Sequence, residues 1–118
     1  MIRFGIAPFL ECSSRGDVRF SAFYARLRLF GGRSIEEMYQ AAKLFADGST
    51  DLTWREAKGR RCVNMDEVRA LYSRLWDLYI EENIALLDTL RQASGVSDVF
   101  GQQGHACQAE ELWRIRNS

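Results

Sequence analysis

Residues 32–48 read GRSIEEMYQAAKLFADG, and in this stretch the patterning of the chain changes from alternating to helical. Ser34 and Glu37 have the spacing of a capping box, in which each side chain binds the backbone N–H of the other. Asp47 and Gly48 form a stop signal. The apolar residues between these signals recur at helical spacing: Ile35, Met38, Tyr39, Ala42 and Phe45. The stretch therefore predicts a helix that begins at Ser34 and ends before Gly48.

Downstream, the sequence predicts further helices. Thr53 and Glu56 repeat the capping spacing ahead of a short helix. A longer helix opens at Asn64, and its predicted inward face is apolar or aromatic: Val68, Leu71, Tyr72, Leu75, Leu78 and Tyr79. The helical pattern continues to Gly95 through a break near residues 82–83, where periodicity leaves a kink and a new helix start as alternatives. A last helix carries Ala109, Leu112 and Trp113.

Upstream, apolar residues alternate with polar ones. Alternation at period two places successive side chains on opposite faces and so predicts short, half-buried strands. Turn residues at 13–17 and 31–32 separate the alternating runs, which are Ile2, Phe4 and Ile6; Val18, Phe20, Ala22 and Tyr24; Leu27 and Leu29. We therefore expect residues 1–118 to form a single α+β domain, mostly helical, with a few short antiparallel strands near the N-terminus.

Composition excludes several classes of protein. The chain has 118 residues, which fits one globular domain, and its sixteen basic and sixteen acidic residues cancel. A neutral chain has no overall field that would draw it to nucleic acid or to anionic lipid. No apolar run approaches the roughly 18–20 residues of a membrane span, and the first residues do not have the pattern of a signal peptide. We therefore expect a protein without a membrane partner.

Cysteine use indicates a reducing compartment. Cys12, Cys62 and Cys107 are odd in number and far apart, which favours free thiols over a disulfide framework. Together with His105, they do not have the spacing of a zinc site. We therefore expect a cytoplasmic protein that holds no metal and needs no cofactor.

One row of side chains on the first predicted helix has the chemistry of a site. Glu36, Gln40 and Lys43 are spaced at i, i+4 and i+7, which places a carboxylate, an amide and an ammonium on one face. If this face borders a cleft, Glu36 is a base or a charge stabiliser and Gln40 reads the edge of a heterocycle. If it borders water, the row is an ordinary solvated helix side, and spacing alone leaves both readings open.

A second group of cations follows the short helix. Lys58, Arg60 and Arg61 surround Gly59, and fourteen of the sixteen basic residues in the chain are arginines. Such a group suits a phosphate, because arginine binds its oxygens in pairs and glycine lets the backbone approach closely. Basic residues at a helix C-terminus equally complement the helix dipole, so the sequence leaves two interpretations.

Five segments, in order along the chain, resemble motifs of the NADAR superfamily of YbiA-like proteins. Residues 34–43, SIEEMYQAAK, resemble the signature S-x-E-H-Y-x-Q-A-x-K. Residues 19–23, RFSAF, resemble F-S-N-F, and residues 57–61, AKGRR, resemble A-x-x-x-G-R-x. Residues 98–101, DVFG, resemble D-x-x-W-G, and residues 112–116, LWRIR, resemble the closing L-M-x-x-R. The resemblance keeps its order over nearly the whole chain.

The resemblance implies a largely helical α+β fold and hydrolysis of N-glycosidic bonds to ribose. The family is associated with ribosylamino-pyrimidine phosphates of the riboflavin pathway and with ADP-ribosyl groups on guanine. By motif, Glu36 is the carboxylate that stabilises an oxocarbenium-like transition state or activates water, and Asp98 shares the acid–base or ribose-binding work. The implied partner is a phosphorylated ribosylamino-heterocycle or an ADP-ribosylated base, with nucleic acid included only in its ADP-ribosylated form.

Four more residues are expected to bind this substrate alongside Gln40 and Lys43. Arg60 stands at the family's Gly-Arg position, and together with Arg19 it is expected to hold phosphate. Phe100, which replaces the usual Trp of the family, or Trp54 is expected to stack on the base.

The chain also departs from the family pattern. Ala22 stands where the family has Asn, Glu37 stands where it has His, and residues 107–109, CQA, stand where an Asn precedes the last helix. Loss of two amides removes hydrogen bonds that a hydroxyl-reading site requires. Either the substrate differs from those of the family, or the activity is weakened or lost.

Two alternatives to an enzyme therefore stay open. One is a binding module that recognises a nucleotide or an ADP-ribose-like ligand without turning it over. The other is a small interaction protein without a ligand, in which Trp54, Trp76 and Trp113 serve the core and partner contacts. The sequence leaves the oligomeric state open.

Overall fold

The computed structural model describes residues 9–12, 15–97 and 108–118. Its α-helices are α1 (Ile35–Ala41), α2 (Trp54–Ala57), α3 (Met65–Glu82), α4 (Ala85–Gln92) and α5 (Gln108–Arg116). Two short 3-10 helices, η1 (Val18–Phe20) and η2 (Arg28–Phe30), and four short strands complete it: β1 (Phe9–Glu11), β2 (Arg26–Leu27), β3 (Arg33–Ser34) and β4 (Gly95–Ser97). Helices dominate and the strands form two small sheets, so the expected mostly helical α+β class is confirmed.

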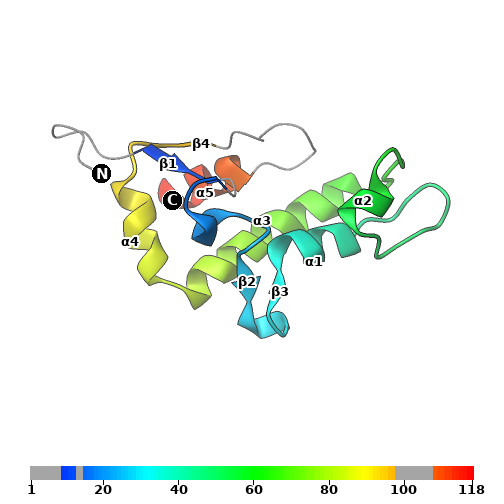
Figure 1. Cartoon of the computed structure of the whole chain (residues 1–118), viewed down its shortest axis with the longest axis horizontal. Helices are drawn as coiled ribbons and strands as arrows, with labels where there is room; N and C mark the ends of the chain where they lie inside the picture. Colours follow the sequence, from blue (N-terminus) through cyan, green and yellow to red (C-terminus); the bar gives the residue numbers. More distant parts are fainter. Residues whose placement is uncertain (1–8, 13–14, 98–107) are drawn as a thin grey trace.

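The longest helix, α3, organises the molecule. Figure 1 shows it crossing the middle, with α1, β2 and β3 on one side and β1, β4 and α5 on the other. The described part of the chain is elongated, with extents of 53 × 28 × 23 Å. Within it, no helix is both long enough and apolar enough to cross a bilayer.

The buried face of α3 forms the centre of the core. Leu75 and Trp76 are fully buried, and Tyr72 and Tyr79 pack edge-on against Trp76 with ring centroids 6.4 and 5.6 Å away. Edge-to-face aromatic pairs add to the stabilisation from burying their area. Of the six residues predicted to face inward on this helix, four are buried and two, Leu71 and Leu78, are half-buried. The helical period therefore identified the core-facing side correctly.

Both predicted capping boxes are present. Ser34 Oγ accepts from Glu37 N at 3.1 Å, and Glu37 Oε1 accepts from Ser34 N at 3.5 Å. Thr53 and Glu56 form the same pair of bonds at the start of α2. Each box satisfies backbone donors that the first helical turn leaves without partners.

Helix α1 is shorter than predicted. It ends at Ala41, because the side chain of Asn64 donates to Ala42 O at 3.0 Å and accepts from Leu44 N at 2.8 Å. These bonds supply the partners that another helical turn would have supplied, and the chain turns away. Phe45 nevertheless remains buried, now bridged to Cys62 in a short extended segment.

The break near residues 82–83 is a new helix start. Helix α3 ends at Glu82, Asn83 has a non-helical backbone, and α4 begins two residues later. The Asn83 side chain donates to Tyr79 O at 2.9 Å, which satisfies one of the last carbonyls of α3.

The strand predictions are partly wrong. Residues 18–20 form the 3-10 helix η1, in which Asp17 accepts from Arg19 N at 3.1 Å, and residues 20–22 are buried in succession instead of alternating. The hairpin of β2 and β3 is antiparallel as expected, whereas β1 pairs in parallel with β4 from the far end of the chain. The run Ile2, Phe4 and Ile6 lies outside the described residues.

Candidate functional site

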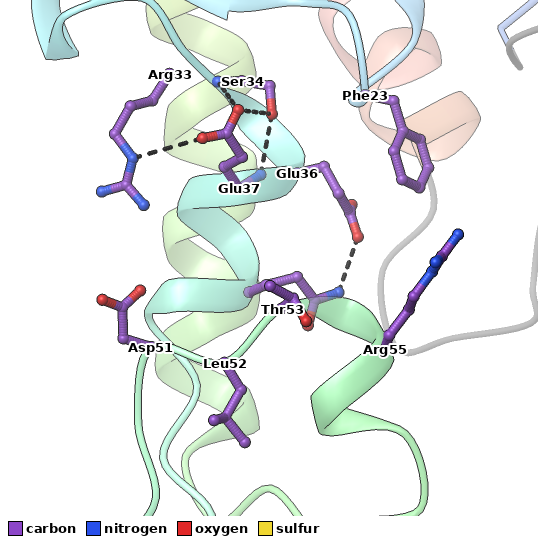
Figure 2. A pocket seen from close by; sticks show the side chains of 10 residues that line it. Phe23, Arg33, Ser34, Glu36, Glu37, Asp51, Leu52, Thr53 and Arg55 are labelled. Carbon is purple, nitrogen blue, oxygen red and sulfur yellow. Dashed lines mark hydrogen bonds and ion pairs between the residues drawn. The ribbon is translucent and has the colours of Figure 1, made fainter.

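A pocket of about 500 Å³ lies at the N-terminal half of α1. Its walls come from three parts of the chain (Figure 2): Phe23; the start and one face of α1, with Arg33, Ser34, Glu36, Glu37 and Gln40; and the approach to α2, with Asp51, Leu52, Thr53 and Arg55. The capping boxes at Ser34 and Thr53 fix the starts of the two helices that border it. The two capping boxes therefore determine where two of the three walls begin.

Glu36 and Gln40 form a bonded pair in this pocket. They lie one turn apart on α1, and Gln40 Nε2 donates to Glu36 Oε1 at 2.8 Å. Gln40 is 9% exposed, and its Oε1 has no hydrogen-bond partner among the described residues. The amide therefore presents its donor side to the carboxylate and orients it. This arrangement fits the cleft reading of the row and not the solvated one.

The surroundings of Glu36 favour its protonated form more than water would. Burial raises the pKa of Glu36, whereas the hydrogen bond from Gln40 and the charge of Lys43 act in the opposite direction. Lys43 lies with Nζ 4.4 Å from the ring centroid of Tyr39, and burial lowers the pKa of this ammonium. Burial also raises the pKa of Tyr39 to about 12, so its phenol stays neutral. Lys43 therefore acts on Glu36 through charge from outside the pocket lining.

This pKa shift predicts how stability depends on pH. The folded protein binds a proton at Glu36 more readily than the unfolded chain does, where the pKa is near 4.5. The contribution of Glu36 to the free energy of unfolding is therefore complete below pH 4.5, and it is lost as the pH rises through the raised pKa of the folded state.

We expect Glu36→Gln to remove this loss of stability, since glutamine is neutral and still accepts from Gln40. Urea denaturation of both proteins from about pH 4 to pH 8 should show the variant gaining stability relative to wild type as the pH rises. An identical pH dependence in the two proteins would show that Glu36 titrates normally.

Phe23 and Arg55 face Glu36 across the pocket. Phe23 is 51% exposed, and Figure 2 shows its ring, the guanidinium of Arg55 and the carboxylate of Glu36 pointing toward the same space. An exposed aromatic ring offers a stacking surface, and a guanidinium offers paired donors to an anion. This side of the pocket therefore combines an apolar face, a cation and a carboxylate.

The other charged groups of the pocket lie on the opposite side of α1. Glu37 turns toward Arg33, with 3.9 Å between Oε2 and Nε, and Figure 2 places Asp51 on this side as well. Glu37 also closes the capping box with Ser34. Its carboxylate therefore serves the helix start, as the sequence predicts.

The structure brings together some of the residues predicted for the site. Glu36 and Gln40 line the pocket, and Lys43 is coupled to Glu36 by charge. Trp54 is the first residue of α2, next to Arg55. Asp98 and Phe100 lie outside the described residues.

The two arginines predicted to hold phosphate do not line this pocket. Arg19 forms a bidentate ion pair with Asp17, with Nη2 2.6 Å from Oδ2 and Nε 2.9 Å from Oδ1. Arg60 binds Asp47 with Nη1 2.5 Å from Oδ2 and donates from Nε to Glu56 O at 2.8 Å. Both guanidiniums therefore lie outside the lining of this pocket, each paired with an aspartate of the same chain.

Sequence reasoning missed Phe23 and Arg55 as site residues. Phe23 belongs to the segment that resembles F-S-N-F, and Arg55 lies inside the second capping segment. The sequence analysis interpreted these two segments as a family motif and a helix start, and gave neither residue a binding role. Nothing local distinguishes them, because the approach of α2 to α1 is what brings Arg55 to the pocket.

The thiols and carboxylates among the described residues show no metal-binding geometry. Within residues 9–12, 15–97 and 108–118, no three His, Cys, Asp or Glu side chains gather as a metal site would require. Cys12 is buried and Cys62 half-buried, and neither forms a disulfide. No protein-family model matches this sequence, and no curated protein matches it significantly.

Proposed function

We propose that this protein is an N-glycosidase that hydrolyses the bond between ribose and a nitrogen heterocycle in a phosphorylated ribosylamino-heterocycle or an ADP-ribosylated base. The observation that carries the proposal is the half-buried carboxylate of Glu36, held by Gln40 in a pocket whose facing wall is Phe23 and Arg55. A carboxylate beside an aromatic ring and a cation matches the three parts of such a substrate, which are the reacting sugar, the base and the phosphate.

The chemistry assigns one role to each group. As the bond between C1′ and the base nitrogen breaks, its electron pair leaves with the nitrogen and positive charge develops on the ribose. The ionised Glu36 stabilises this cation and takes a proton from the water that attacks C1′, while the departing nitrogen takes a proton from solvent. Gln40 keeps the carboxylate in place, because its Nε2 donates to Oε1.

Phe23 and Arg55 take over the binding roles that the sequence analysis gave to other residues. Phe23 is the stacking surface for the base, in place of Phe100 or Trp54. Arg55 is the phosphate ligand, in place of Arg19 and Arg60. Its support is its place in the pocket wall that Glu36 faces.

The test is a panel of ribosylamino-heterocycle phosphates and ADP-ribosylated nucleosides, with release of ribose phosphate or ADP-ribose as the signal and Glu36→Gln as the control. We expect at least one of these substrates to be cleaved by the wild type and not by the variant. If no substrate in either class is cleaved, the proposal fails.

A second candidate function is a binding module. It is favoured because the other carboxylates of the pocket do not lie where one of them could give a proton to the departing nitrogen. Among the described residues that line the pocket, the carboxylates besides Glu36 are Glu37 and Asp51, and both lie away from Phe23 and Arg55. Calorimetric binding of a panel member without product formation would support this second function over hydrolysis.

Arg55→Gln should weaken the binding of phosphorylated substrates. A charge-assisted hydrogen bond contributes about 1.5–3 kcal/mol, so we expect KM to rise about 10- to 100-fold with little change in kcat. Arg91→Gln, on the exposed side of α4, is the matched control and should leave both constants unchanged. The rise in KM should disappear with a dephosphorylated substrate, and an equal rise with both substrates would contradict a phosphate role.

A further inference from the structure

A buried amide at the start of α5 joins three distant segments. The side chain of Gln108 is part of a residue only 8% exposed; its Nε2 donates to Cys12 O at 2.8 Å and its Oε1 accepts from Ala22 N at 2.7 Å. Both bonds are buried and both span most of the chain. One side chain therefore bonds to a backbone acceptor and to a backbone donor, both in the buried interior.

The bond to Ala22 continues into the pocket. Ala22 O accepts from Glu36 N at 3.0 Å, and Ala22 directly precedes Phe23. The N–H groups of a first helical turn have no partner inside their own helix, so Glu36 N depends on this outside acceptor. A chain of hydrogen bonds thus runs from Gln108 through Ala22 to the backbone of Glu36.

We propose that Gln108 is a positioning residue that holds the first turn of α1, and with it Glu36 and Phe23, in the geometry that the pocket needs. This inference rests on the proposed function insofar as that geometry serves a ribosyl substrate. An amide suits the role because it has one donor side and one acceptor side, and both are used here. A carboxylate lacks the donor when it is ionised, and an apolar side chain lacks both.

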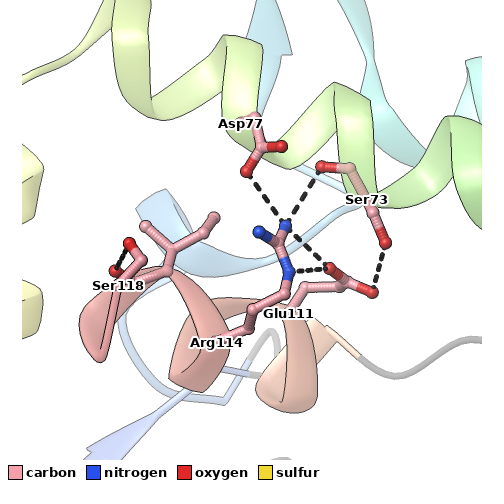
Figure 3. A network of polar contacts seen from close by, with 6 residues as sticks. Ser73, Asp77, Glu111, Arg114 and Ser118 are labelled. Atoms are coloured by element: carbon pink, nitrogen blue, oxygen red, sulfur yellow. Dashed lines mark hydrogen bonds and ion pairs between the residues drawn. The ribbon is translucent and has the colours of Figure 1, made fainter.

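The same helix carries a second set of contacts that provides a control. Arg114 Nη2 donates to Asp77 Oδ1 at 2.9 Å, and Ser73 Oγ donates to Glu111 Oε2 at 2.7 Å, which ties α5 to α3 (Figure 3). None of these bonds involves Ala22 or Glu36. Loss of Arg114 should therefore loosen α5 without disturbing the first turn of α1.

The first test is amide hydrogen exchange in Gln108→Met and in Arg114→Met. The exchange of the backbone amide of Trp76 in α3 is the internal reference for global opening. We expect the amides of Ala22 and Glu36 to exchange at least about tenfold faster relative to this reference in Gln108→Met, and at the wild-type ratio in Arg114→Met. Equal behaviour of the two variants would overturn the proposal, because it would reduce Gln108 to general support of α5.

A conservative variant sharpens this test. Gln108→Glu keeps an acceptor for Ala22 N and loses the donor to Cys12, so we expect the Glu36 amide to stay close to its wild-type ratio. If Gln108→Met does not fold, Gln108→Asn replaces it, since its shorter side chain cannot span both backbone groups. Faster exchange at Glu36 in Gln108→Glu than in the shorter or apolar variant would overturn the proposed chain.

The second test uses turnover. Small misplacements of a reacting group cost up to about 100-fold in rate, so we expect Gln108→Met to lower kcat about tenfold or more. In a Glu36→Gln background the same change should lower the residual kcat by a smaller factor than in the wild type, because the Glu36 part of its effect is already lost, although it still lowers the melting temperature. An independent, multiplicative loss in the double variant would overturn the positioning role.

The two tests separate this inference from the proposed function. Hydrogen exchange decides whether Gln108 governs Glu36, whether or not any substrate is found. Absence of turnover in the wild type, with exchange at Glu36 responding only to changes at Gln108, would reject the glycosidase and support the positioning chain.

Discussion

Replacing Glu36 by glutamine is expected to lower kcat on the cleaved substrate by at least about 100-fold, the lower end of what a positioned acid–base or charge-stabilising group contributes. The variant is nearly isosteric, and its amide oxygen still accepts from Gln40, so the pocket keeps its shape. What it loses is the negative charge that stabilises the ribosyl cation and the base that takes the proton of water. Steady-state kinetics on the purified variant is the measurement.

The control for this variant is Glu67→Gln. Glu67 is an exposed glutamate in the first turn of α3, so it matches Glu36 in its place within a helix and differs in not bordering the pocket. We expect its kcat and KM to equal those of the wild type. Equal activity in the wild type and Glu36→Gln would remove this carboxylate from the mechanism and favour a binding module.

Replacing Trp76 by alanine is expected to lower the free energy of unfolding by about 3–5 kcal/mol. The side chain is fully buried at the centre of the core between Tyr72 and Tyr79, so its removal leaves a cavity that the rings cannot fill without losing their edge-on contacts. Small domains are stable by only about 5–15 kcal/mol. Urea denaturation should therefore show a midpoint that falls sharply, with the slope unchanged.

Two further tryptophan variants make this prediction specific. Trp113 is 39% exposed on α5, and Trp113→Ala should cost about 1.5 kcal/mol or less. Trp76→Phe keeps an aromatic ring and removes Nε1–H, which has no partner among the described residues, so it should cost less than Trp76→Ala. A loss under about 1 kcal/mol in Trp76→Ala would place the centre of the core elsewhere.

The helix starts could be predicted because their causes are local. In both capping boxes the two partners stand three residues apart, so the sequence contains the whole interaction. The buried face of α3 could be predicted for a similar reason, since one helical period repeats over its full length. In both cases the tertiary contacts reinforce what the local sequence already favours.

The helix end and the first strands could not be predicted in the same way. Asn64 ends α1 from 22 residues away, and no nearby signal announces it. Residues 18–22 alternate in polarity, yet Asp17 starts a 3-10 turn there and residues 20–22 are buried in succession. Alternation is evidence for a strand only where a partner strand is present, and the described residues place none beside this segment.

In the candidate site, too, the residues that share one helix could be predicted, and those that come from other segments could not. The spacing of Glu36 and Gln40 predicted their shared face, and their bond and burial settle that this face borders a pocket. Phe23 and Arg55 come to the pocket from other segments, so spacing could not identify them. Arg19 and Arg60 pair with Asp17 and Asp47 and do not line the pocket, which the arginine content of the sequence did not indicate.

The parallel pairing of β1 with β4 has a consequence for how the chain matures. Residues 9–11 pair with residues 95–97, so during synthesis β1 has no partner until residues 95–97 have emerged from the ribosome. Contacts so remote in sequence close late and slowly. Until then the nascent chain exposes the edge of β1 unpaired, and in this interval association with other nascent chains would compete with native closure.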